Sequence, residues 1–227
     1  MDPSIGCLIA ANALFVGTHF AMSHPLRAPL VKAAGPMGFQ GLYSLVALAT
    51  FAWVVFAFRA ADPGVPAWNG QADLACALAT LIMLIASVLL IGSFLGNPAL
   101  PAPGAAELAA KGPHGVFHVT RHPMMWSFAL WSVAHVAVSP TPRVIVLSIA
   151  IGVLALVGAR MQDGKKEALM GPAWREWESK TSYWPRLGAL AQAGAVPWLG
   201  GLALWLAATW AHGWLIGMAA GVWRWVG

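Results

Sequence analysis

Six long apolar runs constrain this chain more than any other feature of its sequence. Each approaches the ~20 mostly apolar residues that cross a bilayer as a helix. Charged residues make up only 9% of the 227 residues, against roughly a quarter in soluble proteins. The sequence therefore predicts an all-α integral membrane bundle of about six transmembrane helices, in a single domain over 1–227. The runs cover about residues 4–24, 39–60, 74–96, 123–139, 142–160 and 197–218.

The distribution of basic residues predicts how this bundle is oriented. Six crossings place the loops alternately on two sides, and ten of the 13 Lys and Arg residues fall on the side of the three long connections. By the positive-inside rule these connections face the cytoplasm and both termini face outward. The first apolar run has no positive region before it, so we expect it to stay as a helix and not to be cleaved as a signal peptide. The expected location is a bacterial-type cell membrane, crossed several times.

Two of the long connections have distinct compositions. Segment 97–113 is rich in Pro, Gly and Ala and is expected to be a loop. Segment 163–186 alternates charged residues with three Trp and a Tyr. This pattern is typical of an amphipathic helix that lies at the membrane interface, with its rings at headgroup level. We therefore expect an interfacial helix on the cytoplasmic side.

The same composition excludes several classes of function. Cys7 and Cys76 lie far apart in apolar runs, and no C-x-x-C-H motif is present for covalent haem attachment. The basic residues are scattered among loops and form no cluster of the kind that binds nucleic acid. The sequence thus predicts the lipid bilayer as a partner and no nucleic acid.

Three of the seven histidines lie inside apolar runs, namely His19, His135 and His212. An imidazole in a bilayer is costly unless it is paired, hydrogen-bonded or bound to a metal. One interpretation is a hydrogen bond between helices, since small neighbouring residues let another backbone approach. The other is axial ligation of a haem held between helices, because neutral imidazole is the usual axial ligand. The other four histidines lie near the predicted cytoplasmic boundary.

A second notable motif, "TRHP", opens the fourth run. Pro123 suits the first turn of a helix, where no backbone N–H is needed. Arg121 and His122 then flank the positive end of that helix, which attracts anions. The motif therefore predicts an anion-binding position at the cytoplasmic mouth of the bundle.

Three blocks resemble a known family in order and spacing. They are "GTHFAMSHPLRAPLVKAAGPMGFQGLYSLVALATFAW", "TRHPMMWSFALWSVAH" and "DGKKEALMGPAWREWESKTSYWP". They are similar to the NnrU family and to its plant and cyanobacterial relatives, the 15-cis-zeta-carotene isomerases. The resemblance covers most of the chain and is weakest at the second run and at 97–113.

The resemblance implies haem b, ligated by two histidines, in an enzyme that isomerises a polyene from cis to trans under redox control. The ligands it implies are His135 and His19, with His24 as a rival for the second position. Arg121 and His122 would hold the haem propionates. The substrate would be a hydrophobic small molecule that enters from the lipid phase, and an electron donor would be a partner.

The third block adds residues of a shared cytoplasmic scaffold or pocket floor. Among these, the resemblance implies that Asp163 and Thr181 support the groups that hold the cofactor. The full set that falls on the family pattern is Asp163, Gly171, Lys180, Thr181, Ser182 and Pro185.

Helix geometry provides an independent comparison of the histidines. At ~1.5 Å per residue, His135 lies roughly 18 Å into the fourth run and His19 only about 8 Å into the first, both measured from the cytoplasmic end. His212 lies about 21 Å along the sixth run and so matches the depth of His135. The pair of His135 and His212 is the geometric competitor of the pair that the resemblance implies.

Two further functions compete with the isomerase. The "RHP" block and "EALMGPAWREWESKTSYWP" are also similar to integral-membrane isoprenylcysteine methyltransferases. That resemblance implies S-adenosylmethionine, with Arg121 and His122 at its carboxylate and Glu167 and Trp174 at its ribose or adenine. It departs from the usual pattern, because this chain has Trp where Tyr is usual. The third possibility is a non-enzymatic haem or redox component linked to nitrite and nitric oxide metabolism.

Overall fold

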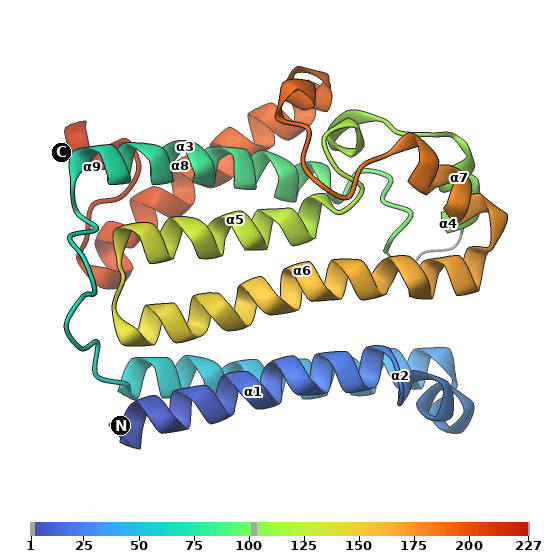
Figure 1. Ribbon diagram of the computed structural model, residues 1–227, viewed down its shortest axis with the longest axis horizontal. Helices are drawn as coiled ribbons and strands as arrows, with labels where there is room; N and C mark the ends of the chain where they lie inside the picture. The colour runs from blue at the N-terminus through green and yellow to red at the C-terminus, as the bar shows by residue number, and fades with distance from the viewer. Residues whose placement is uncertain (1–2, 101–103, 227) are drawn as a thin grey trace.

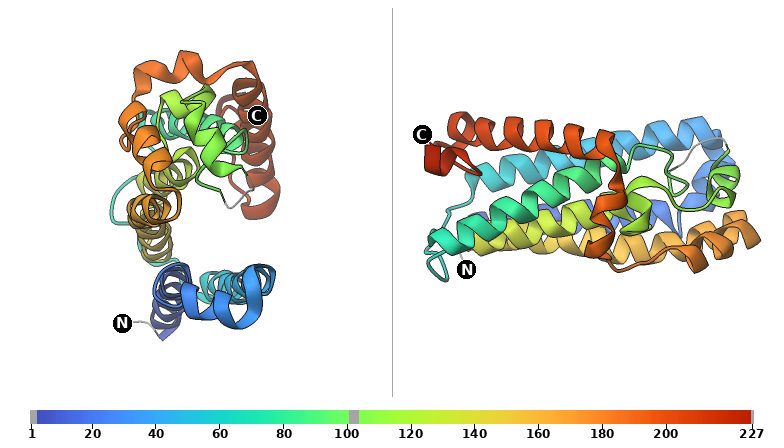
Figure 2. Two further views of the ribbon diagram at one scale, coloured as in Figure 1. Left: turned by 90° about the vertical axis from the view of Figure 1, so that its right-hand side faces the viewer. Right: turned by 90° about the horizontal axis from the view of Figure 1, so that it is seen from above.

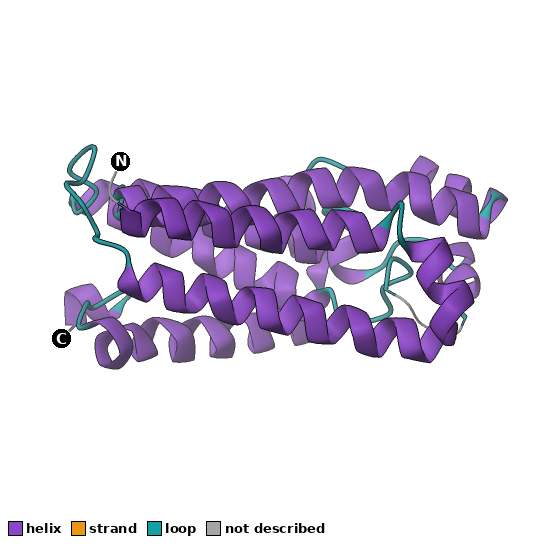
Figure 3. Ribbon diagram, turned by 90° about the horizontal axis from the view of Figure 1, so that it is seen from below, coloured by secondary structure: helices purple, strands orange, loops and turns teal. Residues whose placement is uncertain are grey.

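The computed structural model describes residues 3–100 and 104–226, and in these ranges every regular element is a helix (Figures 1 and 3). The predicted all-α membrane bundle is confirmed. The elements are α1 (Pro3–Ser23), α2 (Arg27–Ala60), α3 (Asp73–Gly92), α4 (Ala105–Ala110), α5 (Pro123–Val138), α6 (Pro142–Met170), α7 (Pro172–Lys180), α8 (Ala195–Ile216) and α9 (Trp223–Val226), with 3-10 turns at Gly115–His118 and Leu187–Ala193.

Five of these helices, α1, α2, α3, α6 and α8, are long and apolar enough to cross a membrane. The predicted run 123–139 forms α5, which is apolar but has only 16 residues. At 1.5 Å per residue it is about 24 Å long, shorter than a hydrocarbon core of ~30 Å. The structure thus supports five spans by length, with α5 as a shorter sixth helix packed between α3 and α6.

The long helices form a row in which each packs against the next, in the order α2, α1, α6, α5, α3 and α8. Figure 2 shows this row end-on, with the α1–α2 pair on one side of α6 and the other helices on its far side. Both termini lie at the same end of the bundle (Figure 1). We call this the terminal end, and the end that holds α7 the α7 end.

Two boundaries differ from the predicted ones for local reasons. The segment 25–38, expected as a loop, is largely helical, because α2 begins at Arg27 and is broken only at Gly35. Gly35 has φ 70° and ψ 171°, a conformation that favours glycine, and it precedes Pro36. The segment 97–113, also expected as a loop, contains the short helix α4.

The interfacial helix was predicted with its rings at headgroup level, and this is wrong for two of its three Trp residues. Helix α6 continues to Met170, and α7 covers only Pro172–Lys180. Trp174 and Trp177 are completely buried in a core cluster, whereas Trp184 is 67% exposed. The amphipathic pattern is real, but α4 and the first 3-10 turn cover its apolar face, where lipid was expected.

Candidate haem site and buried ionic network

Two of the three histidines in apolar helices lie next to each other. His135 of α5 and His212 of α8 have ring centroids 6.2 Å apart and ring planes inclined by 39°. Both are partly buried and both lie near the terminal end of the bundle. Trp131 stacks on His135 at 4.0 Å. The structure therefore brings together the pair that helix geometry alone had favoured.

Backbone carbonyls place a proton on Nδ1 of both rings. Nδ1 of His135 lies 2.8 Å from the Trp131 carbonyl oxygen, and Nδ1 of His212 lies 2.8 Å from the Ala208 carbonyl oxygen. A carbonyl oxygen only accepts hydrogen bonds, so each Nδ1 carries a proton, and in the neutral imidazole each Nε2 then carries a lone pair. Among the described residues neither Nε2 has a hydrogen-bond partner. This is how proteins usually orient a histidine that binds a metal through Nε2.

The spacing of the two rings fits ligation of one metal ion. Metal–imidazole bonds of about 2.0–2.1 Å place two such ring centroids roughly 6 Å apart across the ion. The described residues contain no group of three or more His, Cys, Asp or Glu that could hold a metal ion. A bare ion would therefore have only two side-chain ligands here, whereas haem brings its own four nitrogen ligands and needs only the axial pair.

The structure does not bring His19 and His135 together. His19 lies four residues from the end of α1, and its Nδ1 also contacts the carbonyl oxygen four residues earlier, that of Phe15, at 2.7 Å. Helix α1 runs opposite to α5, so His19 lies toward the α7 end while His135 lies toward the terminal end (Figure 1). Helix α6 packs between these two helices. His24, the rival ligand, follows α1 at the same end as His19.

The "RHP" motif forms a buried ionic network at the other end of α5. Nε of Arg121 donates to both carboxylate oxygens of Asp163, at 3.0 and 3.1 Å, and Nη2 donates to Oδ2 at 2.6 Å. Nε2 of His122 lies 2.8 Å from Oδ1 of the same carboxylate. All three side chains are buried. Asp163, from α6, therefore takes the place of the anion that the motif predicted.

Neighbouring residues complete this network. Glu178 of α7 lies 3.2 Å from Nη2 of Arg121. Burial and the nearby Asp163 carboxylate raise the pKa of Glu178 above its usual value, and the same two causes raise the pKa of Tyr183. Nδ1 of His122 is buried and has no hydrogen-bond partner among the described residues. The Thr181 hydroxyl donates to the Trp177 carbonyl at 2.6 Å and so terminates α7, without a hydrogen bond to the network.

The network and the histidine pair are separate sites. His122 and His135 are 13 residues apart on α5, which corresponds to about 20 Å. Arg121 is already neutralised by Asp163. A haem ligated by His135 therefore has no propionate partner in Arg121 or His122, and the structure does not join these residues into the single site that the resemblance implied.

The residues of the methyltransferase hypothesis are also engaged elsewhere. Trp174 has no exposed surface. Glu167 forms an exposed ion pair with Arg175 at 3.3 Å. The described structure thus presents neither side chain beside a free Arg121.

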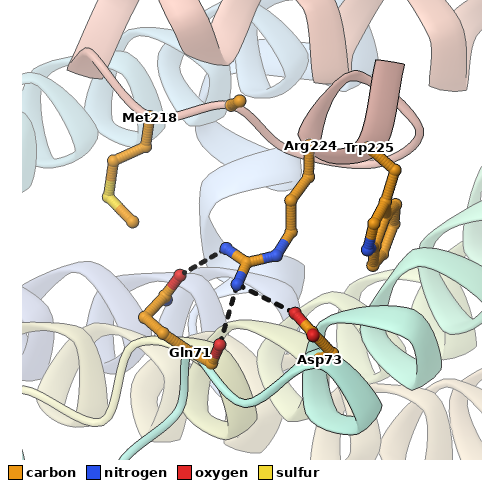
Figure 4. Close-up of a pocket in the computed structure, with 6 residues that line it drawn as sticks. Gln71, Asp73, Met218, Arg224 and Trp225 are labelled. Carbon is orange, nitrogen blue, oxygen red and sulfur yellow. Dashed lines mark hydrogen bonds and ion pairs between the residues drawn. The ribbon is translucent and has the colours of Figure 1, made fainter. Parts of the chain in front are cut away.

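A pocket at the terminal end was missed by the sequence analysis. Its volume is about 420 Å³, and Arg224 lies at its centre (Figure 4). Arg224 donates to the Gln71 backbone and side chain, at 2.8 and 3.2 Å, and to Asp73 at 3.3 Å. Gln71 also donates to the carbonyl of Val138, three residues beyond His135, at 2.6 Å. Nothing in the sequence pairs Gln71 with a residue 153 positions away.

Comparison with known proteins identifies a family for this chain. The family model described as NnrU protein matches residues 7–220. No curated protein matches the chain, and no solved structure does.

Proposed function

This chain belongs to the NnrU family, and we propose that it is a membrane protein that binds haem b between α5 and α8 and isomerises a polyene such as 15-cis-zeta-carotene. His135 and His212 are the proposed axial ligands. The observation that carries the proposal is their spacing of 6.2 Å, with both Nδ1 atoms engaged by backbone carbonyls. His212 takes the place that the family resemblance had implied for His19.

The residues around the pair have defined tasks in this proposal. The Trp131 and Ala208 carbonyls hold the rings in the tautomer that presents Nε2. Trp131 stacks on His135 and limits its rotation. Bound haem b would supply a one-electron redox centre that interacts with a conjugated double bond and lowers its bond order. Isomerisation gains and loses no atoms, and a route in which haem lowers the bond order would need no proton transfer to the substrate.

The surface near the pair suits a substrate that arrives from lipid. Val133 of α5 is 58% exposed, and Trp214 of α8 is 77% exposed, close in sequence to His135 and His212. Apolar side chains exposed on a membrane helix face hydrocarbon. A polyene dissolved in the bilayer can therefore approach this end of α5 and α8 without passing through water.

The basic residues support an orientation for the bundle. In the proposed topology both termini face outward and the α7 end faces the cytoplasm, because the three long basic connections lie at that end. The histidine pair then lies near the outer face of the cell membrane. An electron donor for the proposed haem would act from that side.

A product assay tests the proposed activity. Protein in liposomes is reduced with dithionite, supplied with 15-cis-zeta-carotene, and the isomers are separated by chromatography. We expect trans product from wild type and none from His135→Ala or His212→Ala, with His19→Ala as the matched control that keeps activity.

The same anchoring of both rings favours a second candidate function. Two fixed histidines suit a haem that keeps both ligands in both oxidation states, as in an electron-carrying component linked to nitrite and nitric oxide metabolism. Haem that stays six-coordinate on reduction, in a protein that leaves the cis substrate unchanged, would favour this function over isomerisation.

A further inference from the structure

Most acidic side chains at the α7 end are already paired. Glu107 of α4 is the exception, since it makes no ion pair with any described residue. Carboxylates available to other cations are therefore scarce at this end. The pairs are Asp163 and Glu178 with Arg121, Glu167 with Arg175, and Glu176 with Lys180.

Seven of the ten basic side chains at this end have no carboxylate within ion-pair distance among the described residues, and three of the seven lie where the turn after α1 meets the end of α6. They are Arg27, at the start of α2, and Lys165 and Lys166, near the end of α6. Helices α1 and α6 run in the same direction and pack against each other, with Phe20 beside Gly158, so the turn after α1 lies at the level of the residues near the end of α6. Burial and the Lys165 ammonium also lower the pKa of His24, in the turn before α2. We call Arg27, Lys165 and Lys166 the basic cluster.

The positions of two members are fixed by neutral groups. Nζ of Lys166 is buried and donates to the carbonyl oxygens of Pro98 and Leu100, at 3.0 and 3.2 Å. The Arg27 guanidinium lies 5.6 Å from the centroid of the Phe39 ring. Carbonyl dipoles and aromatic faces stabilise a cation but leave its charge uncompensated. The cluster is thus an ordered group of like charges that lacks an anion.

Helix lengths place the basic cluster at the membrane boundary. Helix α1 ends at Ser23, and Arg27 follows within one turn's length of chain. Helix α6 begins at Pro142, and about 20 residues cross the hydrocarbon core, so Lys165 and Lys166 lie just beyond it. At this depth the available anions are the phosphates of lipid headgroups.

We propose that Arg27 and Lys165 of the basic cluster bind the phosphate of an anionic phospholipid headgroup, with the buried Lys166 adding positive charge behind them, and that this lipid links the α1–α2 turn to the end of α6. Charge complementarity carries the choice, because the phosphodiester supplies the negative charge that no described carboxylate supplies. The site lies at the opposite end from the histidine pair, so it does not depend on the proposed haem.

Native mass spectrometry of the full-length protein in neutral detergent tests this site. Phosphatidylglycerol and phosphatidylcholine are added separately, and inorganic phosphate is added as a third probe in competition. We expect retained phosphatidylglycerol, little phosphatidylcholine, and no displacement by millimolar phosphate. Removal of charge in Arg27→Gln/Lys165→Gln should weaken phosphatidylglycerol binding by about fivefold per charge.

Matched variants separate this site from general charge effects and from misfolding. Arg59→Gln removes an exposed basic residue at the terminal end and should bind like wild type. Arg27→Lys/Lys165→Arg keeps both charges and should retain binding even if the neutral double variant folds poorly. Four results would each overturn the proposal. They are equal binding of the two lipids, an equal loss of phosphatidylglycerol binding in Arg59→Gln, loss of this binding in the charge-preserving variant, and displacement of the lipid by inorganic phosphate.

Discussion

At the residue scale, the ionic network of Arg121, His122 and Asp163 shows what a motif can and cannot predict. The motif indicated correctly that an anion lies at the start of α5. It did not indicate which anion, because Asp163 lies 42 residues from Arg121 and only the packing of α6 brings the two together. A carboxylate of the protein itself and a bound anionic ligand would both pair with Arg121 and His122. The motif alone could therefore not distinguish them.

The substitution Asp163→Asn tests the importance of that carboxylate. It leaves the buried Arg121 with only the partly exposed Glu178 as a counter-charge, and loss of one partner of a buried pair destabilises a protein by about 3–5 kcal/mol. We expect the midpoint of thermal unfolding, measured by circular dichroism in detergent, to fall strongly. The double variant Arg121→Met/Asp163→Leu removes both charges and should be markedly more stable than Asp163→Asn. A single variant as stable as wild type would show that the pair does not stabilise the fold.

Glu178 gives a prediction about pH. Its raised pKa means that the ionised form is less favourable in the folded protein than in the unfolded chain. Ionisation therefore subtracts stability as pH rises past the ordinary value of 4.5, until the pH has passed the raised pKa of the folded state. Glu178→Gln should be at least as stable as wild type at pH 7, and this advantage should vanish near pH 4. The midpoints of thermal unfolding of both proteins at both pH values check this prediction. A Glu178→Gln variant clearly less stable than wild type at pH 7 would contradict it.

At the element scale, the apolar runs predicted where helices lie better than where they end or what they face. Helix α6 extends ten residues beyond the predicted 142–160, because the charged residues after Arg160 continue the same helix outside the hydrocarbon. In α7 the spacing of Trp174 and Trp177 gave the apolar face correctly. Periodicity does not say whether lipid or protein covers such a face, and here protein covers it.

The burial of α7 predicts unequal effects of two Trp substitutions. Trp174→Ala removes a fully buried ring from the core cluster, and large-to-small changes of this kind cost about 3–5 kcal/mol. Trp184→Ala removes a ring that is 67% exposed and should change stability little. Thermal unfolding of the two variants in the same detergent provides the measurement. If α7 lay on the lipid surface as the sequence suggested, the two effects would be similar.

At the scale of the whole molecule, the order of the helices decides which histidines can form a site. The sequence identified His19, His135 and His212 and gave the depth of each. It could not show that α6 packs between α1 and α5, or that side chains of α5 and α8 meet at the terminal end. Depth therefore favoured the pair whose side chains meet, while the family resemblance selected a pair that lies toward opposite ends of the bundle.

Ligation of haem by His135 and His212 is the central claim, and an absorption spectrum tests it most directly. The full-length protein is purified in detergent after expression with ample haem, and spectra are recorded oxidised and dithionite-reduced. We expect a Soret band, with sharp α and β bands after reduction, in wild type and in His19→Ala. We expect these bands to be lost in His135→Ala and in His212→Ala. The account would be contradicted if wild type contained no haem. It would also be contradicted if the Soret band were lost in His19→Ala and retained in His212→Ala.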